Sequence, residues 1–274
     1  MSPSTHYTHS GKAPLVGLLL ALVGGLVAGV ILGAVYGFLI FWSPFVYINA
    51  FITLGFGFGL AVSVGTLAKV GKIRNAQVLT IIALIVAAAA YYVHWSVWVG
   101  RMTDAPVTAP EQVWAFISVI NALGPWSTFG WTPTGFALWA IWGVEALVIV
   151  GLGAVAAHGV IDLPFCEKTG QWTTETVLPG RFDLSDSPSI DSPNSVLQAL
   201  QPNAEPSAAY TEVSVATAEG SELRCVSLNS VVVEVDKDGK EEKKTQNIVK
   251  HMIFDRESFE RLMQLGRPSA AANF

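Results

Sequence analysis

Charge is what the first 160 residues of this sequence lack. Between positions 14 and 161 the charged side chains are Lys69, Lys72, Arg74, Arg101, Asp104, Glu111 and Glu145. Over the whole chain the charged share is 14%, whereas soluble domains average about 25%. This shortage excludes an ordinary soluble domain for the first part. Charge returns to a usual frequency after position 162, so the sequence divides into an apolar part and a polar part.

Cysteine and basic surface are scarce as well. The two cysteines, Cys166 and Cys225, are too few for a disulfide framework. The net charge is −5 and the C-terminal lysines alternate with acids, so we expect no nucleic-acid partner. The sequence has no glycine-rich phosphate loop and no Ser–His–Asp pattern of a nucleophile and its base. We therefore expect no catalytic residues, no cofactor and no enzymatic activity.

Long apolar runs are what the first part has instead. A helix rises 1.5 Å per residue, so about 20 apolar residues cross about 30 Å of hydrocarbon. Four runs are long enough, which predicts an all-α membrane bundle with the lipid bilayer as its surroundings. The third and fourth runs are joined by an outer loop, 101–135, with a short interfacial helix at 110–123. The four predicted spans are 14–42, 45–68, 78–100 and 136–161.

The basic residues between the second and third spans predict the orientation. The segment KVGKIRN holds Lys69, Lys72 and Arg74, and such loops stay in the cytoplasm. Four crossings then place both termini in the cytoplasm, including the tail at 1–13. We expect a multi-pass protein of a bacterial-type inner (plasma) membrane.

Most tryptophans fall near the outer face in this topology. An interfacial aromatic belt is the interpretation we favour. The alternative is an aromatic cavity that opens outward and binds a lipid, a sugar or a cation. The eight tryptophans concerned are Trp42, Trp95, Trp98, Trp114, Trp126, Trp131, Trp139 and Trp142.

Glycines recur at every fourth position of the first span. Glycine costs roughly 1 kcal/mol against alanine in a helix interior, so the repeat calls for a reason. Residues four apart share a helix face, and small residues let helices in lipid approach closely. We expect this face to pack on the second span; the alternative is self-association into a homo-oligomer seam or a pore lining. The predicted packing glycines are Gly25, Gly29, Gly33 and Gly37, with Gly55 and Gly59 on the second span.

Three polar residues within the spans form a candidate intramembrane site. A charge at the bilayer centre costs about 2.5–3.5 kcal/mol on insertion scales, so Glu145 should face protein or a cavity. His94 lies at a similar depth, and the two could interact through water or Tyr92. Such a pair suits a proton relay or cation site, and equally a static hydrogen bond. Asn49, on the face that also carries Thr53, is expected to bond between helices.

The segment FCEKTGQW, just after the fourth span, resembles one knuckle of a zinc ribbon. Thr169 stands where that knuckle has its second cysteine. A structural zinc site needs four ligands, and Cys166 has only the distant Cys225 and His251 to join it. We therefore expect no metal site. Cys166 is the one weak candidate for a metal ligand in this segment.

The polar part is predicted to end in a small folded domain. Residues 163–206 form a juxtamembrane segment and a Ser/Pro-rich linker. Alternating patterns, the turn DKDGK and the helix DRESFERLMQLG predict a β-hairpin and one helix over 207–274. The fold class is thus a four-transmembrane-helix bundle with a small cytosolic β-rich (α+β) domain, whose edge strand can accept another chain.

Three functions are compatible with these features. The first is a non-enzymatic anchor or subunit of an envelope complex, with a protein partner bound through 207–274. The second is an oligomeric channel or transporter component that uses Glu145 and His94. The third, a membrane enzyme acting on lipid, lacks convergent polar groups in the sequence.

Overall fold

The computed structural model describes residues 5–160, 162–185, 190–203, 208–235 and 241–266. The chain forms two compact units. One is Ser10–Asp162, and the other joins Met1–His9 to Leu163–Phe274. The first unit is helical, and its elements are α1 (Leu15–Trp42), α2 (Val46–Val70), α3 (Ala76–Thr103), α4 (Pro110–Leu123) and α5 (Gly135–Val160).

Four of these helices, α1, α2, α3 and α5, are long and apolar enough to cross a membrane. The 28 residues of α1 span about 42 Å at 1.5 Å per residue. The predicted four apolar helices are therefore confirmed as helices. The largest difference in bounds is at α3, which ends three residues later than predicted, at Thr103. It also begins two residues earlier, where Asn75 caps it by accepting a hydrogen bond of 3.1 Å from the Val78 N–H.

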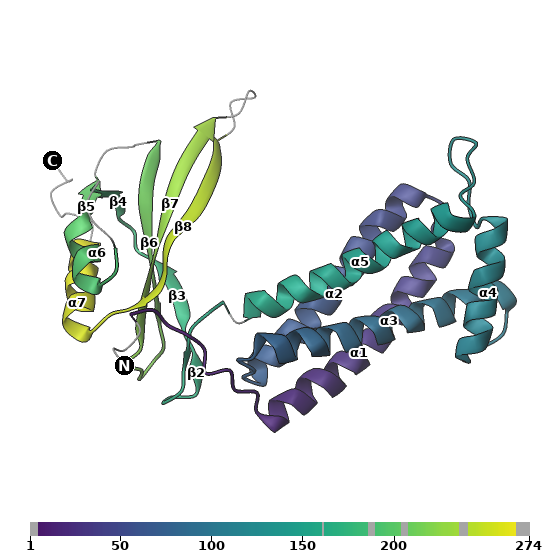
Figure 1. Cartoon of the computed structure of the whole chain (residues 1–274), viewed down its shortest axis with the longest axis horizontal. Coiled ribbons are helices and arrows are strands. Elements are labelled where there is room, and N and C mark those ends of the chain that lie inside the picture. The colour runs from purple at the N-terminus through teal and green to yellow at the C-terminus, as the bar shows by residue number, and fades with distance from the viewer. Residues whose placement is uncertain (1–4, 161, 186–189, 204–207, 236–240, 267–274) are drawn as a thin grey trace. The chain divides into compact units, whose positions relative to one another are not determined.

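The four long helices form a ring in which α1 and α5 each pack against both α2 and α3 (Figure 1). Apolar side chains of all four fill the centre, among them Leu60, Leu79, Val86 and Ile149. A second apolar cluster, with Trp95 and Leu138, lies where α4 meets α3 and α5.

The second unit is built on an antiparallel sheet. Its main strands follow the order β5-β4-β6-β7-β8, β3 also pairs with β6, and β1 pairs with β2 as a separate hairpin. The elements are β1 (Phe165–Cys166), β2 (Gln171–Trp172), β3 (Thr174–Val177), β4 (Arg181–Leu184), α6 (Pro193–Ala199), β5 (Leu200–Asn203), β6 (Ala209–Thr217), β7 (Arg224–Val235), β8 (Glu241–Ile253) and α7 (Arg256–Leu265).

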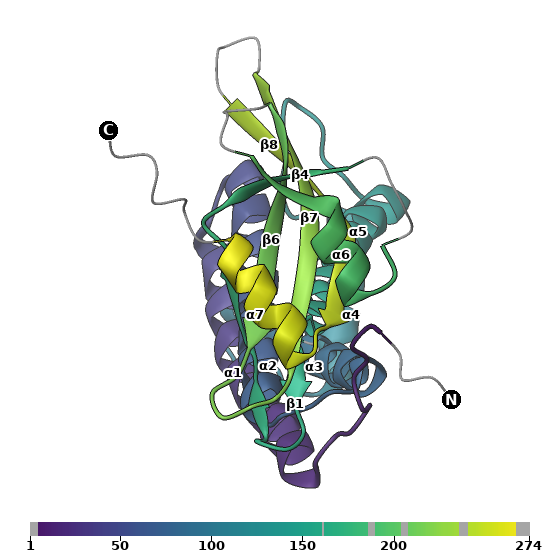
Figure 2. The same ribbon diagram turned by 90° about the vertical axis from the view of Figure 1, so that its left-hand side faces the viewer.

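Helices α6 and α7 cover one face of this sheet (Figure 2). Their buried Val196 and Leu262 pack with Phe182 and Leu228 of the strands. The predicted boundaries of α7 match: the Asp255 carboxylate accepts from the Ser258 N–H at 2.9 Å, and Gly266 follows the last turn. The C-terminal part is therefore an α+β domain, as the sequence predicts.

The domain is larger than the sequence indicates. Residues 163–206 were expected to be a linker, yet they supply β1 to β5 and α6, and β3 pairs with β6 from Thr174↔Thr217 to Val177↔Ser214. The N-terminal tail also joins this unit, because His6 forms a bridge with Met252 of β8. The predicted turn at 236–240 lies outside the described residues.

Candidate functional site

Four helices each contribute a polar side chain to one place inside the helical unit. These are Tyr36 on α1, Thr53 on α2, His94 on α3 and Glu145 on α5, which we call the polar cluster. Tyr36 is 2% exposed, Thr53 8% and His94 2%. Since α1 and α5 lie on opposite sides of the ring, the Tyr36 side chain reaches across its centre.

Tyr36 is the hub of the polar cluster. Its hydroxyl forms a hydrogen bond of 2.7 Å with Oε1 of Glu145 and lies 2.8 Å from the Thr53 hydroxyl. The Thr53 hydroxyl also donates to the backbone carbonyl of Asn49, one turn earlier, at 2.9 Å. The Tyr36 ring stacks on Phe56 with centroids 4.3 Å apart. Three hydrogen-bond contacts therefore connect α2, α1 and α5 in sequence.

His94 belongs to the same place through its ring. Its imidazole centroid lies 4.5 Å from that of Tyr36, 5.4 Å from Tyr91 and 5.1 Å from Trp95. Its Nδ1 atom is buried and has no hydrogen-bond partner among the described residues, and the same holds for Oδ1 of Asn49. Aromatic rings thus surround His94, and its Nδ1 atom forms no hydrogen bond with the described residues.

The sequence named Glu145, His94 and Asn49 but missed Tyr36. Glu145 and His94 both lie beside Tyr36, which takes the place proposed for water or Tyr92. Tyr92 instead donates to the carbonyl of Thr108 at 2.6 Å. Asn49 takes part through its backbone carbonyl, which accepts from the Thr53 hydroxyl, and not through its side-chain oxygen. Tyr36 lies in an apolar run between Gly33 and Gly37. The neighbouring sequence does not distinguish it from a tyrosine at the membrane interface.

The repeated glycines of α1, from Gly25 to Gly37, form a glycine ladder that faces α3, whereas the sequence favoured α2. A Cβ at Gly25 or Gly29 would meet Val86 at 2.9 or 3.3 Å, and one at Gly37 would lie 2.8 Å from the His94 carbonyl oxygen. A Cβ at Gly33 would collide with the carbonyl oxygen of Ala90. Because α3 of the same chain covers this face, a homo-oligomer through span one would have to use the opposite face.

The two glycines predicted on α2 differ in role. A Cβ at Gly59 would touch Leu32 of α1 at 3.5 Å, but one at Gly55 would meet nothing within 4 Å among the described atoms. Gly55 therefore makes no close helix contact among the described residues. Gly57 is one, since its Cβ would lie 2.8 Å from Leu152 of α5.

The tryptophans near one end of the four-helix ring are divided between the core and the surface. Trp95, Trp98 and Trp142 are at most 9% exposed and pack edge to face, with the Trp95 and Trp142 centroids 5.0 Å apart. Trp114 and Trp131 are more than half exposed. The buried rings fill the contact between α3 and α5, so they do not line an outward-opening aromatic cavity.

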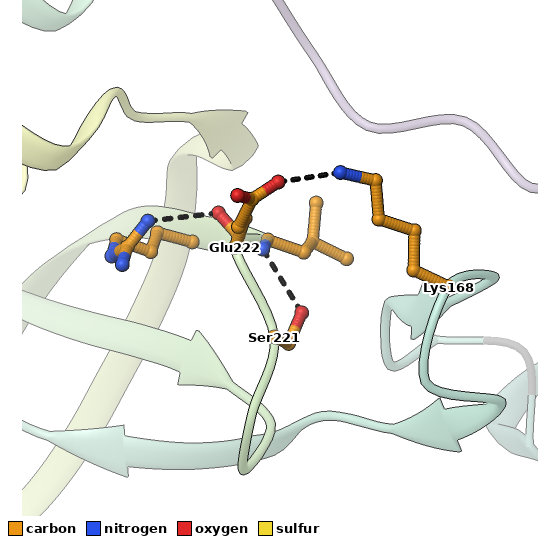
Figure 3. Close-up of polar contacts among 5 residues, drawn as sticks. Lys168, Ser221 and Glu222 are labelled. Carbon is orange, nitrogen blue, oxygen red and sulfur yellow. Dashed lines mark hydrogen bonds and ion pairs between the residues drawn. The ribbon is translucent and has the colours of Figure 1, made fainter.

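The hairpin of β1 and β2 has the knuckle-like turn suggested by the sequence. The Gly170 N–H donates to the Cys166 carbonyl at 2.8 Å, and Gly170 has a φ of +64°. Lys168 at its tip pairs with Glu222 at 2.5 Å in the β6–β7 loop, where Ser221 accepts from the Leu223 N–H (Figure 3). Ion pairing raises the pKa of Lys168 and lowers that of Glu222.

Cys166 lies at the base of this hairpin. Burial alone would raise the pKa of its thiol, but the adjacent hydroxyls of Ser221 and Thr169 and the backbone N–H groups of Thr169 and Lys168 outweigh it and lower the pKa to about 7. Burial raises the pKa of Cys225 to about 12. Among the described residues, no group of three or more His, Cys, Asp or Glu side chains could hold a metal.

Strand β8 is the last strand of the main sheet. One side of it pairs with β7 from Cys225↔Ile253 to Val235↔Glu241. On its other side, at its C-terminal end, the Ile253 N–H donates to the Thr5 carbonyl at 2.8 Å and the Tyr7 N–H donates to the His251 carbonyl at 2.9 Å. All residues from 242 to 248 are exposed. The edge of β8 thus already accepts an extended segment at one end.

Comparisons of the chain with known protein families, with curated proteins and with solved structures found no significant match. What the chain does must therefore be inferred from its own residues.

Proposed function

We propose that this protein is a non-enzymatic membrane anchor whose C-terminal domain docks a protein partner, as a subunit of an envelope complex. The observation that carries the proposal is the edge of β8. Its end accepts residues 5–7 as an extended segment through two backbone hydrogen bonds, while the part from 242 to 248 is exposed and pairs only with β7 among the described residues. An extended segment of a partner can continue the sheet there by main-chain hydrogen bonds.

The helical unit serves as the anchor in a bacterial-type inner membrane, crossing it four times. Two observations support this topology. Lys69, Lys72 and Arg74 gather at the α2–α3 connection, which favours the cytoplasmic side. Residues 5–9 and 163–266 belong to one unit, so the chain enters and leaves the helical unit from the same domain, as an even number of crossings with both termini in the cytoplasm requires.

The composition of the β8 edge favours a regulated partner over indiscriminate association. Glu242, Lys243 and Lys244 occupy its exposed part, and charged side chains, lysine above all, discourage edge-to-edge aggregation. Lys244 is paired with Glu234 of β7 at 2.7 Å. A partner strand therefore needs complementary charges opposite these residues.

Site-specific photocrosslinking in membranes tests the proposal with the full-length chain. A photoreactive residue replaces Gln246 on β8 or, as the matched control, the exposed Glu260 on α7. We expect one discrete protein adduct from position 246 and none of that size from position 260. Identical adducts from both positions, or none from either, would overturn the docking edge.

A channel or transporter component remains the second candidate, because four helices direct polar groups to one place. Glu145-dependent ion flux into vesicles, abolished by Glu145→Gln, would favour it. The cover of the glycine ladder by α3 argues against a pore lined by that face.

A further inference from the structure

The hydrogen bonds of the polar cluster form a linear series, and the donor and acceptor are fixed at one end of it. The series runs from the Asn49 carbonyl to the Thr53 hydroxyl at 2.9 Å, from Thr53 to the Tyr36 hydroxyl at 2.8 Å, and from Tyr36 to Oε1 of Glu145 at 2.7 Å. A carbonyl oxygen can only accept. The Thr53 proton is therefore directed at Asn49.

Counting protons along this series reveals a shortage. Three contacts need three hydrogen atoms, but the hydroxyls of Thr53 and Tyr36 supply one each. If Glu145 is a carboxylate, Tyr36 donates to it and Thr53 donates to Asn49. The 2.8 Å contact between the two hydroxyl oxygens is then left with no hydrogen between them. Buried polar atoms placed so close are ordinarily hydrogen-bonded.

A proton on Glu145 removes the shortage. Glu145 then donates to Tyr36, Tyr36 donates to Thr53, and Thr53 donates to Asn49, so each contact holds one hydrogen. We propose that Glu145 is the proton-binding site of the helical unit, and that its bound proton orients a relay of hydroxyls through Tyr36 and Thr53. Release of that proton reverses the Tyr36 hydroxyl and breaks the contact between α1 and α2.

The surroundings offer this proton no competing positive charge. The titratable groups next to Glu145 are Tyr36 on α1 and Tyr91 on α3. His94 of α3 and Thr53 of α2 lie on the other sides of Tyr36, and of these two only His94 titrates. Among the ion pairs between described residues none includes Glu145. A carboxylate held between apolar helices without a cation is costly, so a proton is the ligand that the cluster suits.

Infrared spectroscopy of the full-length chain in lipid nanodiscs tests the proposal, because protonated carboxyl groups have a C=O band well separated from carboxylate bands. At pH 7 we expect Glu145→Gln to remove an acid band. The matched control is Glu111→Gln, at an exposed position in the first turn of α4, which should remove carboxylate bands only. Loss of carboxylate bands alone in Glu145→Gln would overturn the proposal.

A second pair of variants decides the question if Glu145→Gln does not fold. With the glutamate carboxyls labelled with ¹³C, Thr53→Val should displace the acid band, because it shortens the relay that Glu145 begins. Thr80→Val is the matched control, since the Thr80 hydroxyl likewise donates to a carbonyl one turn back, at 2.9 Å, on α3. Absence of an acid band would show that Glu145 carries no such proton, and an equal displacement in both variants would show that Thr53 is not part of its relay.

Discussion

The hydroxyl of Tyr36 on α1 lies 2.7 Å from Oε1 of Glu145 on α5, and this contact joins two helices across the centre of the ring. Tyr36→Phe keeps the ring that stacks on Phe56 and removes both contacts of the hydroxyl. We expect it to lower the free energy of unfolding by about 1–3 kcal/mol, because Glu145 and Thr53 lose a buried partner. Unfolding of the purified protein in mild detergent measures the loss.

Tyr92→Phe is the matched control for this variant. Its hydroxyl bonds to the Thr108 carbonyl at a more exposed position. Water can replace that bond, so the free energy of unfolding should change by less than about 1 kcal/mol. Equal losses in the two variants would refute a special role for the Tyr36 contact.

Close approach of α1 to α3 predicts opposite effects for two glycine substitutions. Gly33→Ala places a methyl group against the Ala90 carbonyl and should cost about 1–3 kcal/mol of stability through overpacking. Gly55→Ala meets nothing within 4 Å and should stabilise α2 by up to about 1 kcal/mol. Thermal unfolding of both variants compares them, and a loss of similar size at Gly55 would contradict the open space beside Gly55.

The two cysteines should react with alkylating agents at very different rates. At pH 8, a thiol with a pKa of about 7, like Cys166, is about nine-tenths thiolate, while Cys225 with a pKa of about 12 is about one part in ten thousand. We expect iodoacetamide to modify Cys166 first, and Cys225 only after denaturation, because it is fully buried. Mass spectrometry after timed labelling identifies the site.

Ser221→Ala provides the complementary test. The Ser221 hydroxyl helps to lower the pKa of Cys166, so its removal should raise that pKa and slow the labelling at pH 7. An unchanged rate would mean that access to the buried sulfur, and not the amount of thiolate, limits the reaction.

The cap of α7 predicts a pH dependence at acid pH. Hydrogen bonds from the backbone N–H and the hydroxyl of Ser258 lower the pKa of Asp255 below its usual value. The stabilisation is therefore fully present above the pKa of this group in the unfolded chain, about 3.9, and is lost as the pH falls through the lower pKa of the folded protein. Asp255→Asn should keep the cap and flatten this dependence, while Asp255→Ala should cost about 1 kcal/mol at neutral pH. Circular dichroism during acid titration compares the three proteins.

The parts that could be predicted from sequence depend on local patterns. The four long helices follow from apolar runs without charges, and α7 follows from Asp255 and Gly266, which lie next to it. Strands β3 to β5 were missed because each has four residues and gains its stability from distant partners: Thr174 pairs with Thr217. No local signal reports such pairing in a segment rich in serine and proline.

The polar cluster was predictable only in part for a related reason. A carboxylate and an imidazole are rare in apolar runs, so the sequence alone indicates Glu145 and His94 as candidate site residues. Tyr36 is ordinary in such a run, and only the crossing of α1 with the other helices brings its hydroxyl between them. On α2, the segment GFGFG has glycine at every second position, so the sequence alone allows either of two faces to pack against a neighbouring helix. In the structure the face with Gly57 packs against α5.

Pairing of Thr5 and Tyr7 with the end of β8 has a consequence for biosynthesis. Thr5 and Tyr7 complete the sheet only after Ile253 has been made, so they wait without their partner strand during synthesis of helices α1 to α6. This end of the β8 edge is therefore closed by a segment that is made long before the strand it pairs with. A purification tag placed ahead of Thr5 would sit next to the C-terminal domain, and its effects should be looked for there.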